Sequence, residues 1–207
     1  MTLLPPFLAE LMALPAWSAV AALLLLIAAL AVLATATARP RLVVPAIVVM
    51  TVGAAALLLG FEPRPPGVFA PLIAVMLAVV GVVAGGPVVT LVLAAATRGG
   101  APDGAHGGII VPVEASTGTS ARAKPTTREV LRGGLTIGYL ERIVVIAAVL
   151  FARWELLAAL IAVKGLGRFR DLDAGAATER FIIGTLVSLL WAGACGALIV
   201  LGSTAIW

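Results

Sequence analysis

The stretch Trp17 to Ala38, WSAVAALLLLIAALAVLATATA, decides the fold because its 22 residues carry no charge. A helix of about 20 apolar residues crosses the hydrocarbon core of a bilayer. A cleaved signal peptide is the competing interpretation, since Ala34-Thr35-Ala36 is similar to a small-residue cleavage site. A signal core has about 7 to 15 apolar residues behind a basic segment, whereas Glu10 precedes this run without any Lys or Arg. We therefore predict a retained transmembrane helix.

The composition of the whole chain indicates the same class. Of its 207 residues, 62% are hydrophobic and 12% are charged, and the mean hydropathy is +1.17. Soluble domains are about half apolar and about one quarter charged, so an ordinary water-soluble enzyme and a disordered chain are both excluded. We predict an all-α, polytopic transmembrane helix bundle of five to six spans with one short or re-entrant helix.

Three further apolar segments are predicted to span the bilayer. Leu42 to Gly60 and Val68 to Thr97 carry no charge, and Ala177 to Thr204 is apolar over most of its length. Val68 to Thr97 exceeds the length of an upright span, and Gly85-Gly86-Pro87 is its natural breaking point because Pro lacks a backbone N–H. A kink absorbed by packing is favoured, and a broken helix that binds a solute is the alternative. Pro6 to Leu14 is expected to form a separate short helix at the interface.

A polar segment separates these spans from the last third of the chain. It divides the sequence into residues 1–97, with the interfacial helix and three spans, a polar cytoplasmic loop at 98–132, and a C-terminal helical module at 133–207.

Two motifs in the polar loop suggest local structure. Gly107 to Val113 fits a short strand or a docking segment, although a flexible loop with one apolar anchor is favoured. Thr126 and Glu129 have the spacing of a capping box and predict the start of the next helix there.

Charges enter apolar sequence in the last third, where two arrangements of helices compete. In one, Ile143 to Val163 is a single span with two charges at its centre. In the other, Gly133 to Phe151 is a span, Arg153-Trp154-Glu155 forms a turn, and Trp154 to Phe169 is a short return helix. Each central charge costs about 2.5–3.5 kcal/mol on insertion scales, and both arrangements bury two. Because Trp prefers the membrane–water interface, we predict the second arrangement.

The basic residues of the loops predict an orientation. With the N-terminus outside, Arg39, Arg41, the loop at 98–132 and the segment Lys164 to Arg180 all fall on the cytoplasmic side, as the positive-inside rule expects. Six crossings place both termini outside, whereas five crossings move the C-terminus inside.

A cluster of charges is expected within the membrane: Glu141, Arg142, Lys164 and Glu179. Glu141 lies about 12 Å from the cytoplasmic start of its helix and Lys164 about 15 Å below the external turn, at 1.5 Å per residue. We therefore predict that these two side chains face each other. Arg142 points about 100° away from Glu141 and is expected to reach Glu179 or the cytoplasmic headgroups. An ion pair that fixes helix docking is favoured over a proton or ion relay.

Glycine spacing predicts close helix packing. Small residues four apart let two helix backbones approach each other in a membrane. The predicted packing residues are Gly81, Gly85, Gly134, Gly138, Gly193 and Gly196.

The turn that begins at Lys164 is the densest polar motif. Lys164, Arg168 and Arg170 lie beside glycines and could bind an anionic lipid headgroup or a phosphate. Three acidic residues could hold a divalent cation, although neighbouring arginines satisfy them equally well: Asp171, Asp173 and Glu179. We predict no metal and no cofactor.

Several chemistries are poorly supported by the residue counts. His106 is the only histidine and Cys195 the only cysteine, so a site built from several His and Cys ligands and an intrachain disulfide are excluded. The net charge of +4 comes from residues between apolar runs, without interleaved aromatics, and no nucleic-acid partner is predicted.

Three motifs of the last third, in this order, resemble a poorly characterised family of bacterial polytopic membrane proteins: Ile137 to Arg142, Lys164 to Phe169, and Glu179 to Ser188. The resemblance covers Gly133 to Trp191 and carries no known activity. It implies that one module contains Glu141, Arg142, Lys164, Arg168, Phe169 and Glu179.

These observations predict a non-enzymatic accessory or scaffolding subunit that contacts the bilayer and other membrane subunits or further copies of itself. A small ion- or proton-coupled transporter that uses Glu141 and the Gly85-Gly86-Pro87 break is the alternative. An intramembrane enzyme acting on lipid headgroups would need the three acidic residues of the turn to gather around a metal.

Overall fold

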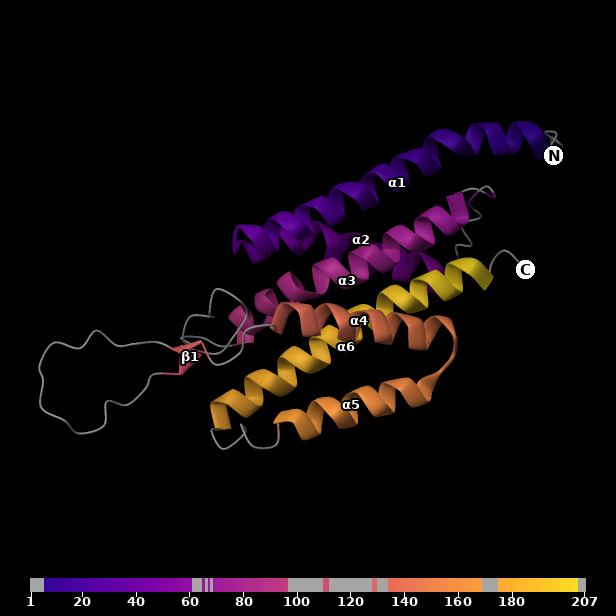
Figure 1. Ribbon diagram of the computed structural model, residues 1–207. Coiled ribbons are helices and arrows are strands. Elements are labelled where there is room, and N and C mark those ends of the chain that lie inside the picture. Colours follow the sequence, from indigo (N-terminus) through magenta and orange to yellow (C-terminus); the bar gives the residue numbers. More distant parts are fainter. Residues whose placement is uncertain are drawn as a thin grey trace, which may run out of the picture.

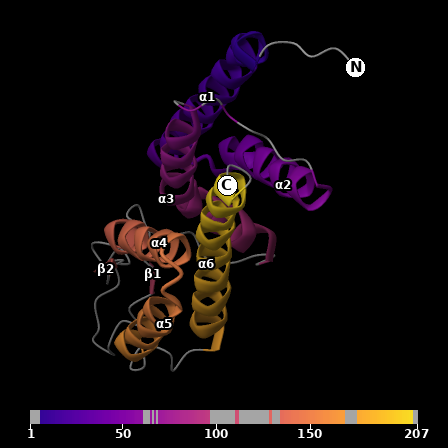
Figure 2. The ribbon, with the colours of Figure 1, turned by 90° about the vertical axis from the view of Figure 1, so that its right-hand side faces the viewer.

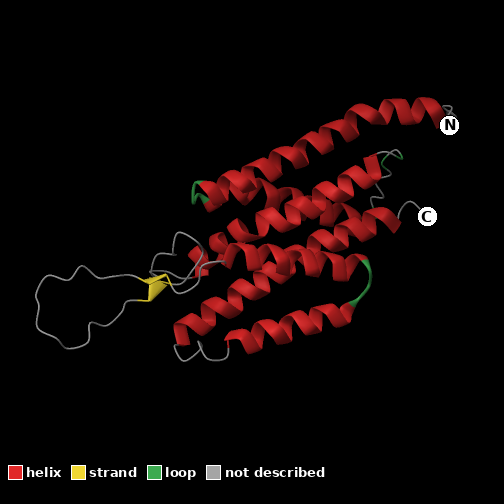
Figure 3. Cartoon of the chain, in the orientation of Figure 1, coloured by secondary structure: helices red, strands yellow, loops and turns green. Residues whose placement is uncertain are grey.

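The computed structural model describes residues 6–60, 65, 67, 69–96, 110–111, 128–129, 134–168 and 175–204. The described elements are α1 (Pro6–Ala36), the 3-10 helix η1 (Pro40–Val43), α2 (Val44–Leu58), α3 (Phe69–Ala96), β1 (Ile110–Val111), β2 (Arg128–Glu129), α4 (Gly134–Leu150), α5 (Trp154–Arg168) and α6 (Gly175–Thr204). Figure 3 shows that helices dominate this part of the chain, and the predicted all-helical class is confirmed.

Within the described ranges, four helical segments are long and apolar enough to cross a membrane: Ala13–Ala36, Pro40–Leu58, Phe69–Ala96 and Thr178–Gly202. They hold 24, 19, 28 and 25 residues, against the roughly 20 that a span needs. These four segments support a membrane protein. The fifth and sixth spans stay a prediction.

Helix α1 corrects the prediction of a separate interfacial helix. It runs without interruption from Pro6 to Ala36 and contains Pro15. A proline inside a helix removes one backbone hydrogen bond, and the remaining ladder on both sides is sufficient to continue the helix here. The hydroxyl of Ser18 donates to the Pro15 carbonyl at 2.8 Å.

Helix α3 decides between the two interpretations of Gly85-Gly86-Pro87. The backbone is helical from Phe69 to Ala96 with Pro87 inside, so the predicted alternative of a broken helix is wrong. Pro87 and Gly85 are both buried, which indicates that tight packing holds this segment in a helix.

The core is built mainly from small and branched residues where α3 and α6 meet. Figure 2 shows α4 and α5 to the lower left of α6 and α2 to its right, with α1 and α3 above. The larger buried cluster joins α1, η1, α2, α3 and α6 and contains Ile27, Ala31, Val43, Ala46, Met50, Val80, Ala84, Val88, Trp191 and Cys195. The smaller cluster contains Val145, Ile146, Ala192 and Ile199. The helices of the first 96 residues, α1 to α3, and those of the last third, α4 to α6, therefore share one packed bundle through α3 and α6.

The predicted capping box of the polar loop is wrong. Glu129 lies in β2, which pairs antiparallel with β1 through Ile110↔Glu129 and Val111↔Arg128. Helix α4 begins only at Gly134, because the backbone at 128–129 is committed to strand pairing. The short strand that was the less favoured interpretation of Gly107 to Val113 is present at Ile110–Val111, and the rest of that motif lies outside the described residues.

The division of the last third into two helices joined by a turn, as in the second arrangement, is confirmed, whereas the span predicted for the first of them stays a prediction. Helix α4 ends at Leu150, a turn follows, and α5 begins at Trp154. Ala152 adopts a left-handed conformation with φ 51°, which an L-residue rarely adopts without local constraint. The backbone there is closed by the Arg153 N–H, which donates to the Ala148 carbonyl at 2.8 Å.

Successive helices run in opposite directions through the bundle. In Figure 1 the start of α1, the α4–α5 turn and the end of α6 lie at one end, whereas the end of α1 and the starts of α4 and α6 lie at the other. Arg39 and Arg41 of the α1–α2 turn are therefore at the same end as the C-terminus of α5.

Candidate functional site

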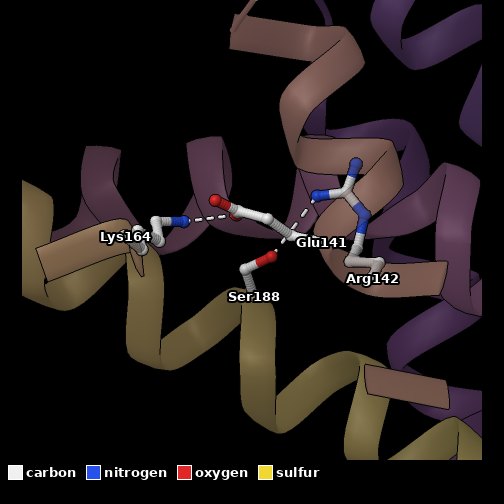
Figure 4. A network of polar contacts seen from close by, with 4 residues as sticks. All are labelled: Glu141, Arg142, Lys164 and Ser188. Atoms are coloured by element: carbon white, nitrogen blue, oxygen red, sulfur yellow. Dashed lines mark hydrogen bonds and ion pairs between the residues drawn. The ribbon is translucent and has the colours of Figure 1, made fainter. Parts of the chain in front are cut away.

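An ion pair joins α4 to α5 (Figure 4). The Lys164 ammonium donates to the Glu141 carboxylate, and this contact confirms the pairing that their matched depths predict. The side chains are 21% and 11% exposed, so the pair lies at the edge of the bundle rather than in its centre. The Lys164 Nζ atom also lies 5.9 Å from the centroid of the Phe181 ring of α6, within the range of a cation–π contact.

Arg142 lies deeper than its neighbour and is only 4% exposed. Its Nε donates to the Val82 carbonyl of α3 at 2.7 Å, and its Nη1 donates to the Ser188 hydroxyl of α6 at a long 3.4 Å. The guanidinium carbon lies 5.3 Å from the centroid of the Tyr139 ring. Arg142 therefore connects α3, α4 and α6.

The predicted partners of Arg142 are wrong. Glu179 is exposed, and the buried guanidinium does not reach outward to headgroups. Because consecutive helix residues point about 100° apart, Arg142 faces the bundle interior while Glu141 faces α5. A helical carbonyl keeps a second lone pair beside its ladder bond, so Val82 can accept Arg142 while it remains in α3.

Two glycines make room for the arginine. A Cβ atom added at Gly85 would overlap Arg142 Cδ and lie 2.8 Å from its Nε, and one added at Gly138 would lie 3.4 Å from its Nη1. Real Cβ atoms essentially never approach a heavy atom within 3.0 Å. The observed position of the Arg142 side chain therefore requires a glycine at 85. At position 138 an added Cβ would only just fit beside the guanidinium.

The other predicted packing glycines divide into three groups. A Cβ at Gly81 would lie 2.8 Å from Ile146 Cδ1, and one at Gly196 would lie 3.0 Å from Val149 Cβ, so both sites require close approach. A Cβ at Gly193 meets nothing within 4 Å. Gly193 therefore makes no close helix contact within the described bundle, and a packing role against a partner stays a prediction. Gly134 begins α4.

The predicted anion-binding turn is only partly described. Lys164 turns toward Glu141, and Arg168 ends α5. The side chain of Arg168 and residues Phe169 and Arg170 lie outside the described part, as do Asp171 and Asp173. Among the side chains that the structure describes, no group of three His, Cys, Asp or Glu residues could hold a metal ion.

Sequence reasoning missed two members of the cluster. Ser188 is buried and provides a hydroxyl to Arg142, and its isolation among apolar residues of α6 was the available signal. Val82 contributes only a backbone carbonyl, which no side chain could have revealed. In the larger core, Trp191 is 8% exposed and its Nε1 has no hydrogen-bond partner among the described residues.

Cys195 is fully buried among apolar residues of α6 and its neighbours. Its Sγ lies 4.0 Å from the Sδ of Met50 in α2, so the thiol packs within the larger core.

Comparison with known proteins identifies no relative. No protein-family model, no curated protein and no solved structure matches the chain.

Proposed function

We propose that this chain is a non-enzymatic membrane protein, an accessory or scaffolding subunit, in which buried charges organise the C-terminal helices. The observation that carries the proposal is the position of Arg142. This residue of α4 is 4% exposed and donates hydrogen bonds to Val82 of α3 and Ser188 of α6. A cation held in this way fixes relative helix positions, because moving away from the Val82 carbonyl would leave its Nε donor unsatisfied in the bundle interior.

The surface of the bundle supports a role in assembly. Large apolar side chains are exposed on several helices, including Val52 at 62% on α2 and Leu190 at 71% on α6. Without a membrane, patches of this kind would be unusual for a soluble monomer. Within a bilayer they meet lipid or the helices of other subunits, and we propose that further subunits or copies of this chain occupy part of them.

The test is gentle detergent extraction followed by mass spectrometry of what stays bound. The scaffold proposal expects a stoichiometric membrane-protein partner that is lost when residues 99–124 of the polar loop are deleted. A chain that elutes alone, with only lipid bound, would contradict the proposal.

A small proton- or ion-coupled transporter is the second candidate, favoured by the position of Glu141. This carboxylate lies at the bundle edge with an 11% exposed side chain, and ionisable groups within a membrane often mark ion pathways. The candidate can no longer use a break at Gly85-Gly86-Pro87, because α3 is continuous there. Proteoliposome flux that is lost in Glu141→Gln but kept in Gly193→Ala would favour the transporter over the scaffold.

The cellular setting is part of the same proposal. We place the chain in the cytoplasmic membrane of a bacterium, with the N-terminus outside and the 98–132 loop in the cytoplasm. The positions of Arg39 and Arg41 at one end of the bundle support this orientation through the positive-inside rule. Attachment of a reporter enzyme after residue 118 and, separately, after residue 62 tests it.

A further inference from the structure

Helix α5 carries a short apolar strip that is bounded by charges at both ends. At the turn, Arg153 and Glu155 form an ion pair at 3.6 Å whose side chains are 67% and 66% exposed. Toward the other end, Lys164 is paired with Glu141. The uncharged strip between these pairs is Leu156 to Val163, which has eight residues.

This strip is much shorter than the hydrocarbon core of a bilayer. At 1.5 Å per residue, eight residues cover about 12 Å, and the whole of α5 with its 15 residues covers about 22 Å. A bilayer core is about 30 Å thick. By contrast, Thr178–Gly202 of α6 has 25 residues and is long enough to cross a bilayer even when tilted.

The outer face of α5 is open. Among the described elements, α5 packs mainly on α4 and also reaches α6 through Lys164 beside Phe181, and Figure 2 shows it at the rim of the bundle. Three apolar side chains of the strip are exposed, Leu156 at 43%, Ile161 at 54% and Val163 at 70%. An undistorted bilayer would cover these side chains only by also placing acyl chains against one of the two flanking ion pairs.

We propose that the bilayer is locally thinned along α5, so that phospholipid headgroups and their water approach the strip from both ends. This inference rests on the membrane placement in the proposed function. Charge complementarity selects lipid headgroups as the occupant, because each end of the strip presents both an acidic and a basic group to partners that themselves carry phosphate. Trp154 at the turn is 61% exposed, as expected for a tryptophan at the headgroup level. Thinning of the bilayer is a known response to a hydrophobic segment shorter than the core.

The experiment measures water at a nitroxide label in the full chain reconstituted in phosphatidylcholine vesicles, by deuterium modulation in D₂O. The label is placed at Ile161→Cys on α5, with a matched control at Leu186→Cys on α6, because both native side chains are 54% exposed. A second control at Leu25→Cys, 58% exposed, reports the middle of α1. The native thiol of Cys195 is fully buried. Wild-type protein treated with the same nitroxide reagent checks that this thiol does not react.

The proposal expects a severalfold larger deuterium signal at position 161 than at positions 186 and 25. The double variant Arg153→Leu with Glu155→Leu lengthens the strip at the turn and should reduce the signal at 161. A label at 161 as dry as the two controls would overturn the proposal. Wet labels at all three positions would instead refute the membrane placement itself, whereas loss of the scaffold partner in the extraction experiment would leave this inference intact.

Discussion

Replacement of Gly85 by alanine is predicted to destabilise the bundle through a single contact. The added Cβ overlaps Arg142 Cδ and lies 2.8 Å from Nε and 3.1 Å from Cζ. Arg142 must then move, although its Nε is held by the Val82 carbonyl at 2.7 Å. Overpacking of a tight core costs about 1–3 kcal/mol, and a hydrogen bond from a charged group contributes about 1.5–3 kcal/mol.

The sign of the stability change separates a clash with Arg142 from the general effect of replacing glycine by alanine in a helix. Gly to Ala in a helix interior is favourable by about 1 kcal/mol, and Gly193→Ala on α6 should show that gain because its Cβ meets nothing within 4 Å. Gly85→Ala has the same gain and both costs, so we expect a net loss of about 1.5–5 kcal/mol. Reversible unfolding of detergent-solubilised protein by increasing SDS measures both variants.

A double-mutant cycle assigns the loss to the arginine. In an Arg142→Met background the methionine side chain is flexible and makes no hydrogen bond to Val82. The loss in free energy of unfolding caused by Gly85→Ala should therefore shrink by about 1 kcal/mol or more. Equal stabilities of Gly85→Ala and Gly193→Ala, or an unchanged cost in the Arg142→Met background, would refute the reasoning.

Three further outcomes follow from the same contacts. Lys164→Ala should lower the free energy of unfolding by about 3 kcal/mol, because the Glu141 carboxylate, with a side chain only 11% exposed, then loses its partner; the exchange Glu141→Lys with Lys164→Glu should recover part of that loss, and no recovery in SDS unfolding would contradict a direct pair. Ser188→Ala should cost only about 0.5 kcal/mol, the low end for a hydrogen bond, since its contact with Arg142 is 3.4 Å long; a loss as large as that of Arg142→Met would show that Ser188 has another role. Cys195 is 0% exposed and should react with a maleimide only after unfolding, so rapid labelling of the folded protein would contradict its burial.

Hydropathy and charge predicted those parts of the fold that depend on the bilayer. The apolar runs located α1, α2, α3 and α6, and the interfacial preference of Trp154 located the α4–α5 turn. Helix rise alone was enough to pair Glu141 with Lys164, because both residues occupy one edge of an antiparallel hairpin.

The remaining features depend on tertiary packing, which spacing does not encode. Four-residue spacing marks glycines on one helix face but does not say whether a neighbour covers that face, so Gly193 was grouped with Gly196. Arg142 bonds to a backbone carbonyl, which is present at every position of α3. The capping box at Thr126 to Glu129 failed because strand pairing competes locally with helix initiation.

The central claim is that Arg142 joins three helices inside the bundle, and its most direct test is a distance. The protein is labelled with ¹⁵N-arginine and ¹³C-carbonyl valine and reconstituted in lipid. Solid-state NMR then measures the ¹⁵N–¹³C dipolar coupling between the Arg142 Nε and the carbonyl carbon of Val82. An Nε···O distance of 2.7 Å to Val82 predicts strong dephasing, which a Val82→Leu variant, carrying an unlabelled carbonyl at the same place, abolishes. Dephasing that is absent in the wild-type protein, or that persists in Val82→Leu, would contradict the account.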